Sequence, residues 1–259
     1  MRARLWDGPA PYACGTEAAD IPHLDVYLPE PERATGAGML ILPGGAYTFL
    51  SEKSGVQYAR WLADAGIAGM VVNFRLGSAG YRYPAILADA WRALAVARSN
   101  AQRWSLDPDR IGVIGTSAGG HLAAMMLTGV TADGAEPVGT RPALGVLCYS
   151  VISMLDPLAH HETRGNFLGD LADDEETQRR FSGELLVDDG VPPCFVWHTL
   201  ADEEVTAVGS MKFARALHDR GIRYELHLYQ TGPHASGLAR DLGLRWTDDC
   251  VRWLRGHGF

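Results

Sequence analysis

The most informative stretch of this chain is Arg110-Ile-Gly-Val-Ile-Gly-Thr-Ser-Ala-Gly-Gly-His-Leu-Ala-Ala-Met-Met126. An apolar, strand-like run (110–115) leads into the pattern Gly-x-Ser-x-Gly, and residues of helical spacing (118–127) follow it. This strand–turn–helix setting is that of a nucleophile elbow, where two glycines leave room for a tight turn that exposes the serine hydroxyl. The pattern therefore predicts that Ser117 is a nucleophile at the carboxyl end of a strand, although a glycine-rich helix start with Ser117 as its cap remains the alternative.

Short apolar runs alternate with longer runs of helical period along the whole chain. This alternation predicts an α/β fold, a mostly parallel sheet with helices on both faces. The expected strands are residues 24–28, 39–42, 67–74, 110–115, 144–150, 194–199 and 224–229. The expected helices are residues 57–65, 85–102, 118–127, 208–220 and 241–255.

Length and composition narrow the class of protein. The chain has 259 residues, 47% of them hydrophobic, and 23 Lys and Arg against 31 Asp and Glu, a formal net charge of −8. Without a basic run to follow a phosphate backbone, nucleic acid is not an expected partner. No apolar segment approaches the roughly 18 residues of a membrane span, and no secretion signal is recognised, so we expect no membrane association and a cytoplasmic location.

One segment interrupts the alternation of strands and helices. Residues 1–259 show no repeat or linker, so we expect a single domain with an insertion at residues 153–191. Part of the insertion, 173–180, has acidic residues first and arginines last, which fits a solvated surface helix. A cap over a pocket is the other interpretation, and the two can hold for different halves of the segment.

The four cysteines, Cys14, Cys148, Cys194 and Cys250, lie far apart and form no C-x-x-C pair. We expect reduced, structural thiols, because a free cysteine in an apolar strand behaves as a small hydrophobic residue. A disulfide between Cys148 and Cys194 stays open, since their two strands could be neighbours in one sheet.

A glycine-rich loop, Leu42-Pro-Gly-Gly-Ala-Tyr47, follows the expected strand 39–42. Such a loop can present backbone N–H groups to the oxyanion that forms when a serine attacks an acyl group. We therefore predict an oxyanion hole made by the N–H groups of Gly45, Ala46 and Ala118, the last at the positive end of its helix.

A serine hydroxyl needs a base to take its proton, and the base needs a third group to orient it. Asp202 and His234 each follow the last residue of an expected strand, so they should lie on the same edge of the sheet as Ser117. Glu203 and Glu204 compete with Asp202 for the role of the acid, but their longer side chains would need a different loop path.

Other histidines compete with His234 for the role of the base. His121 lies one helical turn after the serine, where we expect it to pack beside the site. His198 lies inside an expected strand, which favours a buried, hydrogen-bonded histidine. His160 and His161 belong to the insertion and could face the pocket without acting as the base.

With these elements placed, the chain resembles the α/β-hydrolase esterases, and most closely the acetyl xylan esterase and BD-FAE (feruloyl/acetyl esterase-like) group near the hormone-sensitive-lipase branch. The resemblance lies in four stretches: Leu42 to Tyr47, Asp107 to Ala124, Phe195 to Thr199, and Gly232-Pro-His234. It implies an α/β-hydrolase fold with Ser117, Asp202 and His234 as the catalytic triad. The chain departs from the family at Ala46, where a third glycine is usual, and at Thr206, where a proline is usual.

The resemblance implies a serine carboxylesterase that hydrolyses short acyl esters, with acetylated sugars as the favoured substrates and neither a metal nor another cofactor. A polar insertion over the rim predicts a small acyl pocket, and its expected lining is Tyr47, Thr116, His161 and Val205. The alternatives are another acyl hydrolase, such as an arylformamidase or a small peptidase, and a catalytically silent fold that acts as a small-molecule receptor. The sequence leaves the oligomeric state undetermined.

Overall fold

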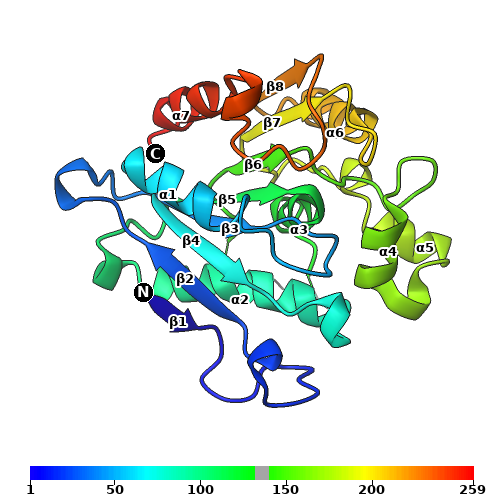
Figure 1. Cartoon of the computed structure of the whole chain (residues 1–259), viewed down its shortest axis with the longest axis horizontal. Coiled ribbons are helices and arrows are strands. Elements are labelled where there is room, and N and C mark those ends of the chain that lie inside the picture. The colour runs from blue at the N-terminus through cyan, green and yellow to red at the C-terminus, as the bar shows by residue number, and fades with distance from the viewer. Residues whose placement is uncertain (132–139) are drawn as a thin grey trace.

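The computed structural model describes residues 1–131 and 140–259. The strands in this part of the chain are β1 (Arg2–Arg4), β2 (His23–Tyr27), β3 (Gly38–Leu42), β4 (Ala68–Asn73), β5 (Ile111–Thr116), β6 (Gly145–Cys148), β7 (Cys194–Thr199) and β8 (Tyr224–Tyr229). They form one sheet in the order β1-β2-β4-β3-β5-β6-β7-β8 (Figure 1). Strands β3 to β8 pair in parallel, while β2 is antiparallel to both of its neighbours. This confirms the predicted mostly parallel sheet.

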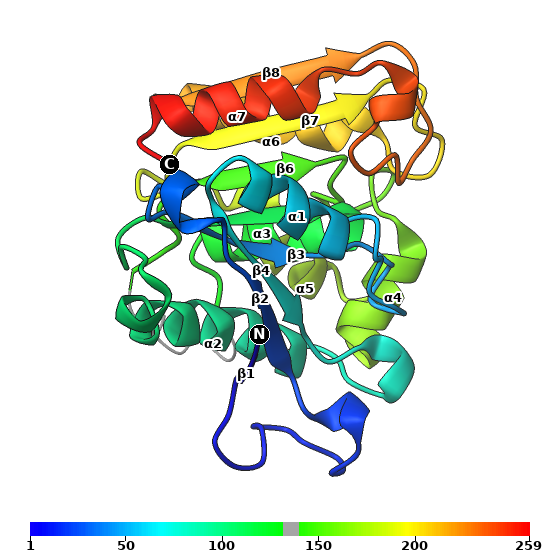
Figure 2. The ribbon, with the colours of Figure 1, turned by 60° about the vertical axis from the view of Figure 1, so that its left-hand side comes forward.

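The α-helices in the same part of the chain are α1 (Val56–Asp64), α2 (Ala85–Ser99), α3 (Ser117–Leu127), α4 (His161–Leu168), α5 (Glu175–Arg180), α6 (Ala207–Asp219) and α7 (Trp246–Gly256). In Figure 2, α1 and α7 lie in front of the sheet, and α3 and α6 lie behind it. Figure 1 places α4 and α5 beyond the end of the sheet toward which the strands β4 and β5 point.

Strand β3 shows why helices are needed on both faces. Its side chains alternate: Met39 and Ile41 join the part of the core that includes residues of α1 and α7, and Leu40 and Leu42 join the part that includes α2, α3 and α6. All four side chains are buried. A strand that is apolar on both sides can only be stable inside such a three-layer arrangement.

The strands and helices predicted outside the segment 153–191 agree with the structure to within one residue at either end, with three exceptions. The helix predicted at 85–102 ends at Ser99. The strand predicted at 144–150 ends at Cys148, because Tyr149 adopts a φ of 37°, which no strand residue has. The helix predicted at 241–255 begins only at Trp246, because Gly243 adopts a φ of 67° after a single turn of 3₁₀-helix. The short strand β1 is an element that the sequence did not predict.

The segment 153–191 contains α4, which is an additional element, and α5, which lies within the predicted helix 173–180. Helix α5 has no buried residue, and Asp174 caps it by accepting a hydrogen bond from the Thr177 N–H at 2.8 Å. The prediction of a solvated surface helix is thus confirmed for this half of the segment.

The four cysteines are free. Cys148 and Cys194 lie on neighbouring strands, but Cys194 pairs with Gly145 and Cys148 with Trp197. The two cysteines are thus three residues apart along the strand direction, which is about 10 Å and beyond the reach of a disulfide. The option of a bridge between them is therefore wrong.

The segment before β2 is attached to the sheet by a buried ion pair. The Arg75 guanidinium donates to both carboxylate oxygens of Asp89, at 2.8 and 2.9 Å, and both side chains are fully buried. The Trp6 indole also donates to Asp89, and Arg75 donates to the Pro11 carbonyl oxygen. One ion pair therefore links the N-terminal segment, the loop after β4 and α2.

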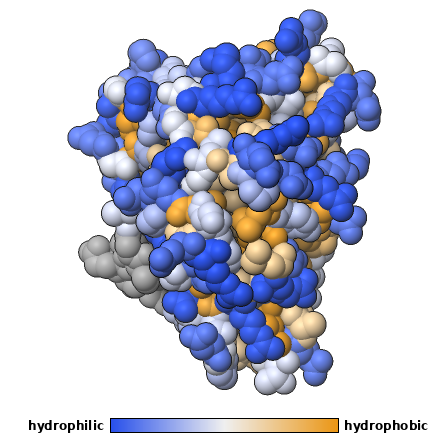
Figure 3. Space-filling model, turned by 90° about the vertical axis from the view of Figure 1, so that its left-hand side faces the viewer, coloured by the Kyte–Doolittle hydropathy of each residue, from blue (hydrophilic) through white to orange (hydrophobic). Residues whose placement is uncertain are grey.

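Figure 3 shows the face of the molecule at the left of Figure 1, where hydrophilic residues cover most of the surface and hydrophobic ones form small groups between them. None of the helices in residues 1–131 and 140–259 combines the length and the apolar character that a membrane span requires.

Candidate active site

Ser117 lies at a sharp turn between β5 and α3. Its φ is 51°, in the left-handed region that non-glycine residues rarely adopt. The flanking glycines are required sterically: a methyl group at Gly115 would collide with the Gly119 carbonyl oxygen, and one at Gly119 would collide with the Leu42 carbonyl oxygen. The structure thus has the tight strand–turn–helix geometry that the sequence predicted, and the serine projects from the carboxyl edge of the sheet.

The structure brings the side chains of Ser117, His234 and Asp202 together in one chain of hydrogen bonds. His234 Nδ1 lies 2.6 Å from Asp202 Oδ2, and His234 Nε2 lies 2.9 Å from Ser117 Oγ. An ionised carboxylate can only accept, so Nδ1 carries a proton and donates a hydrogen bond to Asp202. Nε2 is then the acceptor for the Ser117 hydroxyl, which is the orientation that a general base needs.

The surroundings of Asp202 keep its carboxyl group ionised. Its Oδ1 accepts the backbone N–H groups of Glu204 at 3.0 Å and Val205 at 2.9 Å. Burial alone would raise the pKa of Asp202, but the hydrogen bonds from His198 and His234 outweigh it and hold that pKa well below its usual range. Glu203 and Glu204 are exposed, and it is Asp202, not the carboxylate of either, that contacts His234; Glu204 contributes its backbone N–H.

The loop after β3 presents backbone donors beside Ser117. The Gly44 N–H donates to Ser54 Oγ, whereas the N–H groups of Gly45 and Ala46 have no hydrogen-bond partner among the described residues. Ala46 adopts a φ of 51° in spite of its methyl group, and its carbonyl oxygen accepts a hydrogen bond from Asn166 Nδ2 at 2.9 Å. Asn166 belongs to α4, which no sequence pattern predicted.

The third predicted donor belongs to Ala118, the second residue of α3. The first four N–H groups of an α-helix have no acceptor within the helix, and they carry its positive end. This N–H group therefore has the electrostatic character that the oxyanion role requires.

A cavity of about 180 Å³ opens above Ser117. Phe49, which is 59% exposed, and the acidic residues Glu162 and Glu204 line it. His160, at the start of α4, is half-buried, and this burial lowers its pKa below the usual value. The lining consists of Gly44, Gly45, Ala46, Phe49, Ser51, Ser54, Thr116, Ser117, Tyr149, His160, Glu162, Glu204, His234 and Ala235.

Of the four residues predicted to line the pocket, Thr116 does so. The other three predictions are wrong. Tyr47 is buried in the core, where its ring stacks on that of Phe167 at 5.2 Å between centroids. His161 has a largely exposed side chain that contacts Asp156 at 2.6 Å. Val205 is buried and supports the Asp202 carboxylate through its backbone.

Two further histidines lie near the site without contacting Ser117. His121 is fully buried; its Nε2 donates to the Phe181 carbonyl oxygen at 3.0 Å, and its Nδ1 accepts the Tyr47 hydroxyl at 2.8 Å. Burial lowers the pKa of His121 to about 4. His198 is also fully buried, as predicted, but it contacts Asp202, which the sequence did not reveal.

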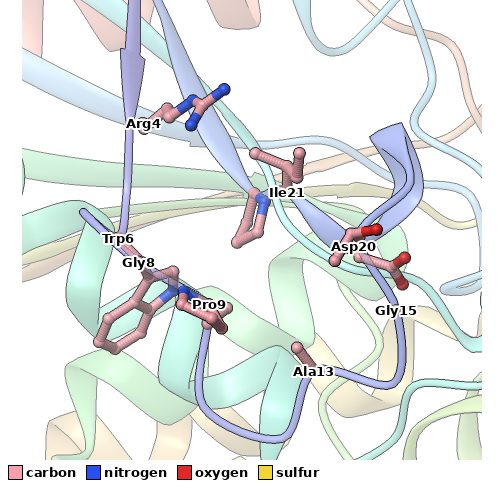
Figure 4. Close-up of a pocket in the computed structure, with 11 residues that line it drawn as sticks. Arg4, Trp6, Gly8, Pro9, Ala13, Gly15, Asp20 and Ile21 are labelled. Atoms are coloured by element: carbon pink, nitrogen blue, oxygen red, sulfur yellow. The ribbon is translucent and has the colours of Figure 1, made fainter.

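Another cavity, of about 170 Å³, lies beside the N-terminal segment (Figure 4). Trp6, Pro9 and Ile21 are among its walls, and its lining includes neither a histidine nor a serine nor a cysteine. It therefore lacks the pair of nucleophile and base that the cavity above Ser117 has. Within residues 1–131 and 140–259, no group of three or more His, Cys, Asp or Glu side chains has an arrangement that could hold a metal ion.

The chain was compared with family models, curated proteins and solved structures. The BD-FAE family model matches residues 24–143. The acetylxylan esterase of Xylanibacter ruminicola is 31% identical over 217 residues, which is 80% of this chain and 42% of that protein. The endo-1,4-beta-xylanase B of Butyrivibrio fibrisolvens is 29% identical over 230 residues, 85% of this chain and 35% of that protein. The chain thus spans less than half the length of these two curated relatives.

Among the solved structures that match over nearly their full length is one with substantial sequence identity. It is the acetyl ester-xyloside bifunctional hydrolase from Caldicellulosiruptor lactoaceticus, with a TM-score of 0.89 and 34% sequence identity. The match covers 100% of this chain and 97% of that one. With this agreement in sequence and in fold, the chain belongs to the BD-FAE group of the α/β-hydrolase esterases.

Proposed function

We propose that this protein is a serine carboxylesterase that removes short acyl groups, acetyl above all, from esters of carbohydrates. The observation that carries this proposal is the chain of hydrogen bonds from Asp202 through His234 to Ser117 at the base of an open cavity. Each group in it has the partner that acyl transfer to a serine requires.

In the first half of the reaction, Ser117 Oγ attacks the ester carbonyl carbon while its proton moves to His234 Nε2. Asp202 stabilises the imidazolium that results. The carbonyl oxygen becomes an oxyanion, for which the N–H groups of Gly45, Ala46 and Ala118 are the donors. The bond from the carbonyl carbon to the alcohol oxygen then breaks, and that oxygen takes the proton from Nε2.

The second half repeats these steps with water. His234 Nε2 takes a proton from the water as its oxygen attacks the acyl-serine, and the oxyanion forms at the same donors. Ser117 Oγ then leaves with the proton from Nε2, and the carboxylic acid is released.

The size of the cavity favours a short acyl group. Its volume of about 180 Å³ is below the roughly 300–1,000 Å³ of pockets that hold drug-sized ligands. Each additional methylene in an apolar pocket changes the binding free energy by only about 1–3 kcal/mol, so selectivity between neighbouring chain lengths should be graded.

Two features of the cavity favour a sugar as the alcohol. The exposed ring of Phe49 offers a flat apolar surface, and the carboxylates of Glu162 and Glu204 can accept hydrogen bonds from hydroxyl groups. Two carboxylates would also disfavour an anionic substrate. Two of the relatives, an acetylxylan esterase and an acetyl ester-xyloside bifunctional hydrolase, support this choice of substrate.

The test is a panel of substrates with the whole chain: p-nitrophenyl esters from acetyl to decanoyl, an acetylated xylo-oligosaccharide, and N-formylkynurenine. We expect kcat/KM to be highest for the acetyl to butyryl esters, to decline steadily toward octanoyl, and to be measurable for the acetylated sugar. Ser117→Ala is the control and should lower kcat by several orders of magnitude.

Three outcomes would overturn parts of the proposal. The decanoyl ester as the best substrate, with the acetylated sugar untouched, would replace it by a lipase-like function. N-formylkynurenine as the best substrate would make the protein an arylformamidase. A fluorophosphonate probe that leaves Ser117 unlabelled would identify a catalytically silent fold.

A further inference from the structure

The carboxylate of Asp202 lies between two histidines. His234 Nδ1 lies 2.6 Å from Oδ2, and on the other side His198 Nε2 lies 3.2 Å from the same oxygen. The side chains of His198 and Asp202 are both fully buried, so water does not compete for this contact. His198 is the residue before the last one of β7, four positions before Asp202.

The partners of His198 determine which of its nitrogens carries a proton. Nε2 faces two groups that can only accept, Asp202 Oδ2 and the Val205 carbonyl oxygen at 2.9 Å, so it is the donor to both. Nδ1 lies 2.8 Å from the hydroxyl of Ser210 in α6, which donates to it. The ring is thus fixed at both nitrogens, between α6 and the turn that carries Asp202.

These contacts close a ring of hydrogen bonds around the turn 202–205. The Val205 N–H donates to Asp202 Oδ1, and the Val205 carbonyl oxygen and Asp202 Oδ2 share the N–H of His198. Oδ1 is therefore held by the backbone, whereas Oδ2, the oxygen that orients His234, also accepts a hydrogen bond from His198.

We propose that His198 is a positioning residue for the reaction: its Nε2–H fixes Asp202 Oδ2 in the plane and direction from which that oxygen orients His234. This inference rests on the proposed function, because it extends the chain of hydrogen bonds that ends at Ser117. His198 contacts neither Ser117 nor the cavity, so it acts only through Asp202. Its loss should misalign His234 by a fraction of an ångström, and small displacements of this kind lower the rate of the chemical step with little effect on substrate binding.

The test compares two amides at position 198. In His198→Gln the side-chain nitrogen can take the place of Nε2 and still donate to Asp202. In His198→Asn the shorter amide takes the place of Nδ1, which keeps a partner for Ser210 and removes the donor to Asp202. The two variants thus carry the same functional group and differ in which histidine nitrogen it replaces.

We expect His198→Asn to lower kcat for p-nitrophenyl acetate by about 10- to 100-fold with KM unchanged. His198→Gln should keep kcat within a few-fold of the parent protein. The midpoint of thermal unfolding is measured for both variants. It should fall by similar amounts, because each variant loses the hydrogen bonds made by one of the two nitrogens of His198.

A loss of kcat that is equal in the two variants, or that follows their unfolding midpoints, would give His198 a purely structural role and overturn the inference. Should the Asn variant not fold, His198→Gln decides, because it loses the Ser210 contact and keeps the donor to Asp202: a kcat within a few-fold of the parent in spite of a lower unfolding midpoint supports the inference, and a kcat at least 10-fold lower refutes it. A parent protein that hydrolyses no ester would instead refute the proposed function itself.

Discussion

The ring of His234 stands edge-on against the ring of Tyr149, with centroids 5.2 Å apart and planes at 79°. Tyr149 directly follows β6, and its hydroxyl accepts the N–H of Gly237, three residues after His234. The Tyr58 hydroxyl donates to the carbonyl oxygen of Gly237 at 3.1 Å. Two tyrosines from different elements thus hold the loop that carries the proposed base.

We predict that Tyr149→Phe and Tyr58→Phe each lower the free energy of unfolding by about 1–3 kcal/mol, because each leaves a polar group of Gly237 without its partner. Each should also lower kcat, since the loop that carries His234 loosens. Urea unfolding and ester hydrolysis measure the two effects. Tyr229→Phe is the control: the Tyr229 hydroxyl is buried without a hydrogen-bond partner among the described residues, so its removal should leave stability and kcat unchanged. Equal behaviour of all three variants would contradict the prediction.

The ion pair between Arg75 and Asp89 should be important for stability and irrelevant to the chemistry. Asp89→Ala leaves a charged guanidinium without its partner in the core, so we expect the free energy of unfolding to fall by about 3–5 kcal/mol. The matched control is Asp219→Ala, which removes the partner of Arg215 in an exposed pair and should cost less than about 1 kcal/mol. Urea unfolding gives both values, and similar costs for the two variants would refute the expectation.

His121 should make stability depend on pH. Its folded-state pKa of about 4 lies below the value of 6.5 in an unfolded chain, so below pH 6.5 the unfolded chain binds a proton that the folded protein does not. The contribution of His121 is therefore fully present above pH 6.5 and is lost as the pH falls toward 4. His121→Gln cannot titrate, so its stability should vary less between pH 4 and 6.5 than that of the parent protein. Parallel curves of unfolding free energy against pH would show that His121 does not make this contribution.

The proposed oxyanion hole depends on the backbone of Gly45. Its φ is 129°, and a methyl group there would collide with the Phe49 carbonyl oxygen. We expect Gly45→Ala to lower kcat by about 10²- to 10³-fold, as the loss of one oxyanion donor does. Gly80→Ala is the control, because Gly80 also has a positive φ, 85°, but open space around its Cα. A Gly45→Ala variant with the kcat of the control would exclude this loop from the oxyanion hole.

The sequence predicted those parts of the fold and site that depend on local pattern. The mainly apolar run 194–199 gives the bounds of β7 without error, because a strand buried on both faces needs such a run. The alternating residues 224–229 give the bounds of β8, which is the partly exposed edge strand. Since parallel strands end at one edge of the sheet, chain order alone placed Ser117, Asp202 and His234 near one another.

The parts that the sequence did not predict depend on contacts between distant segments. Helix α4 is short and has no apolar stripe, so nothing in its own residues indicates that Asn166 holds the loop at Ala46 or that Glu162 faces the cavity. The position of Tyr47 in the glycine-rich loop predicts a place in the pocket, but its ring packs in the core against Phe167 of α4. The contact of His198 with Asp202 likewise depends on the path of the turn after β7.

The most direct measurement of the central claim is to locate the acyl group in the covalent intermediate. The protein is mixed with p-nitrophenyl acetate, quenched with acid within the first turnover, and digested for mass spectrometry. We predict a single acetyl group on the peptide that contains Ser117, formed as fast as the burst of p-nitrophenol and absent from Ser117→Ala. An acetyl group on another residue, or a Ser117→Ala variant that hydrolyses the ester at the parent rate, would contradict the assignment of Ser117 as the nucleophile.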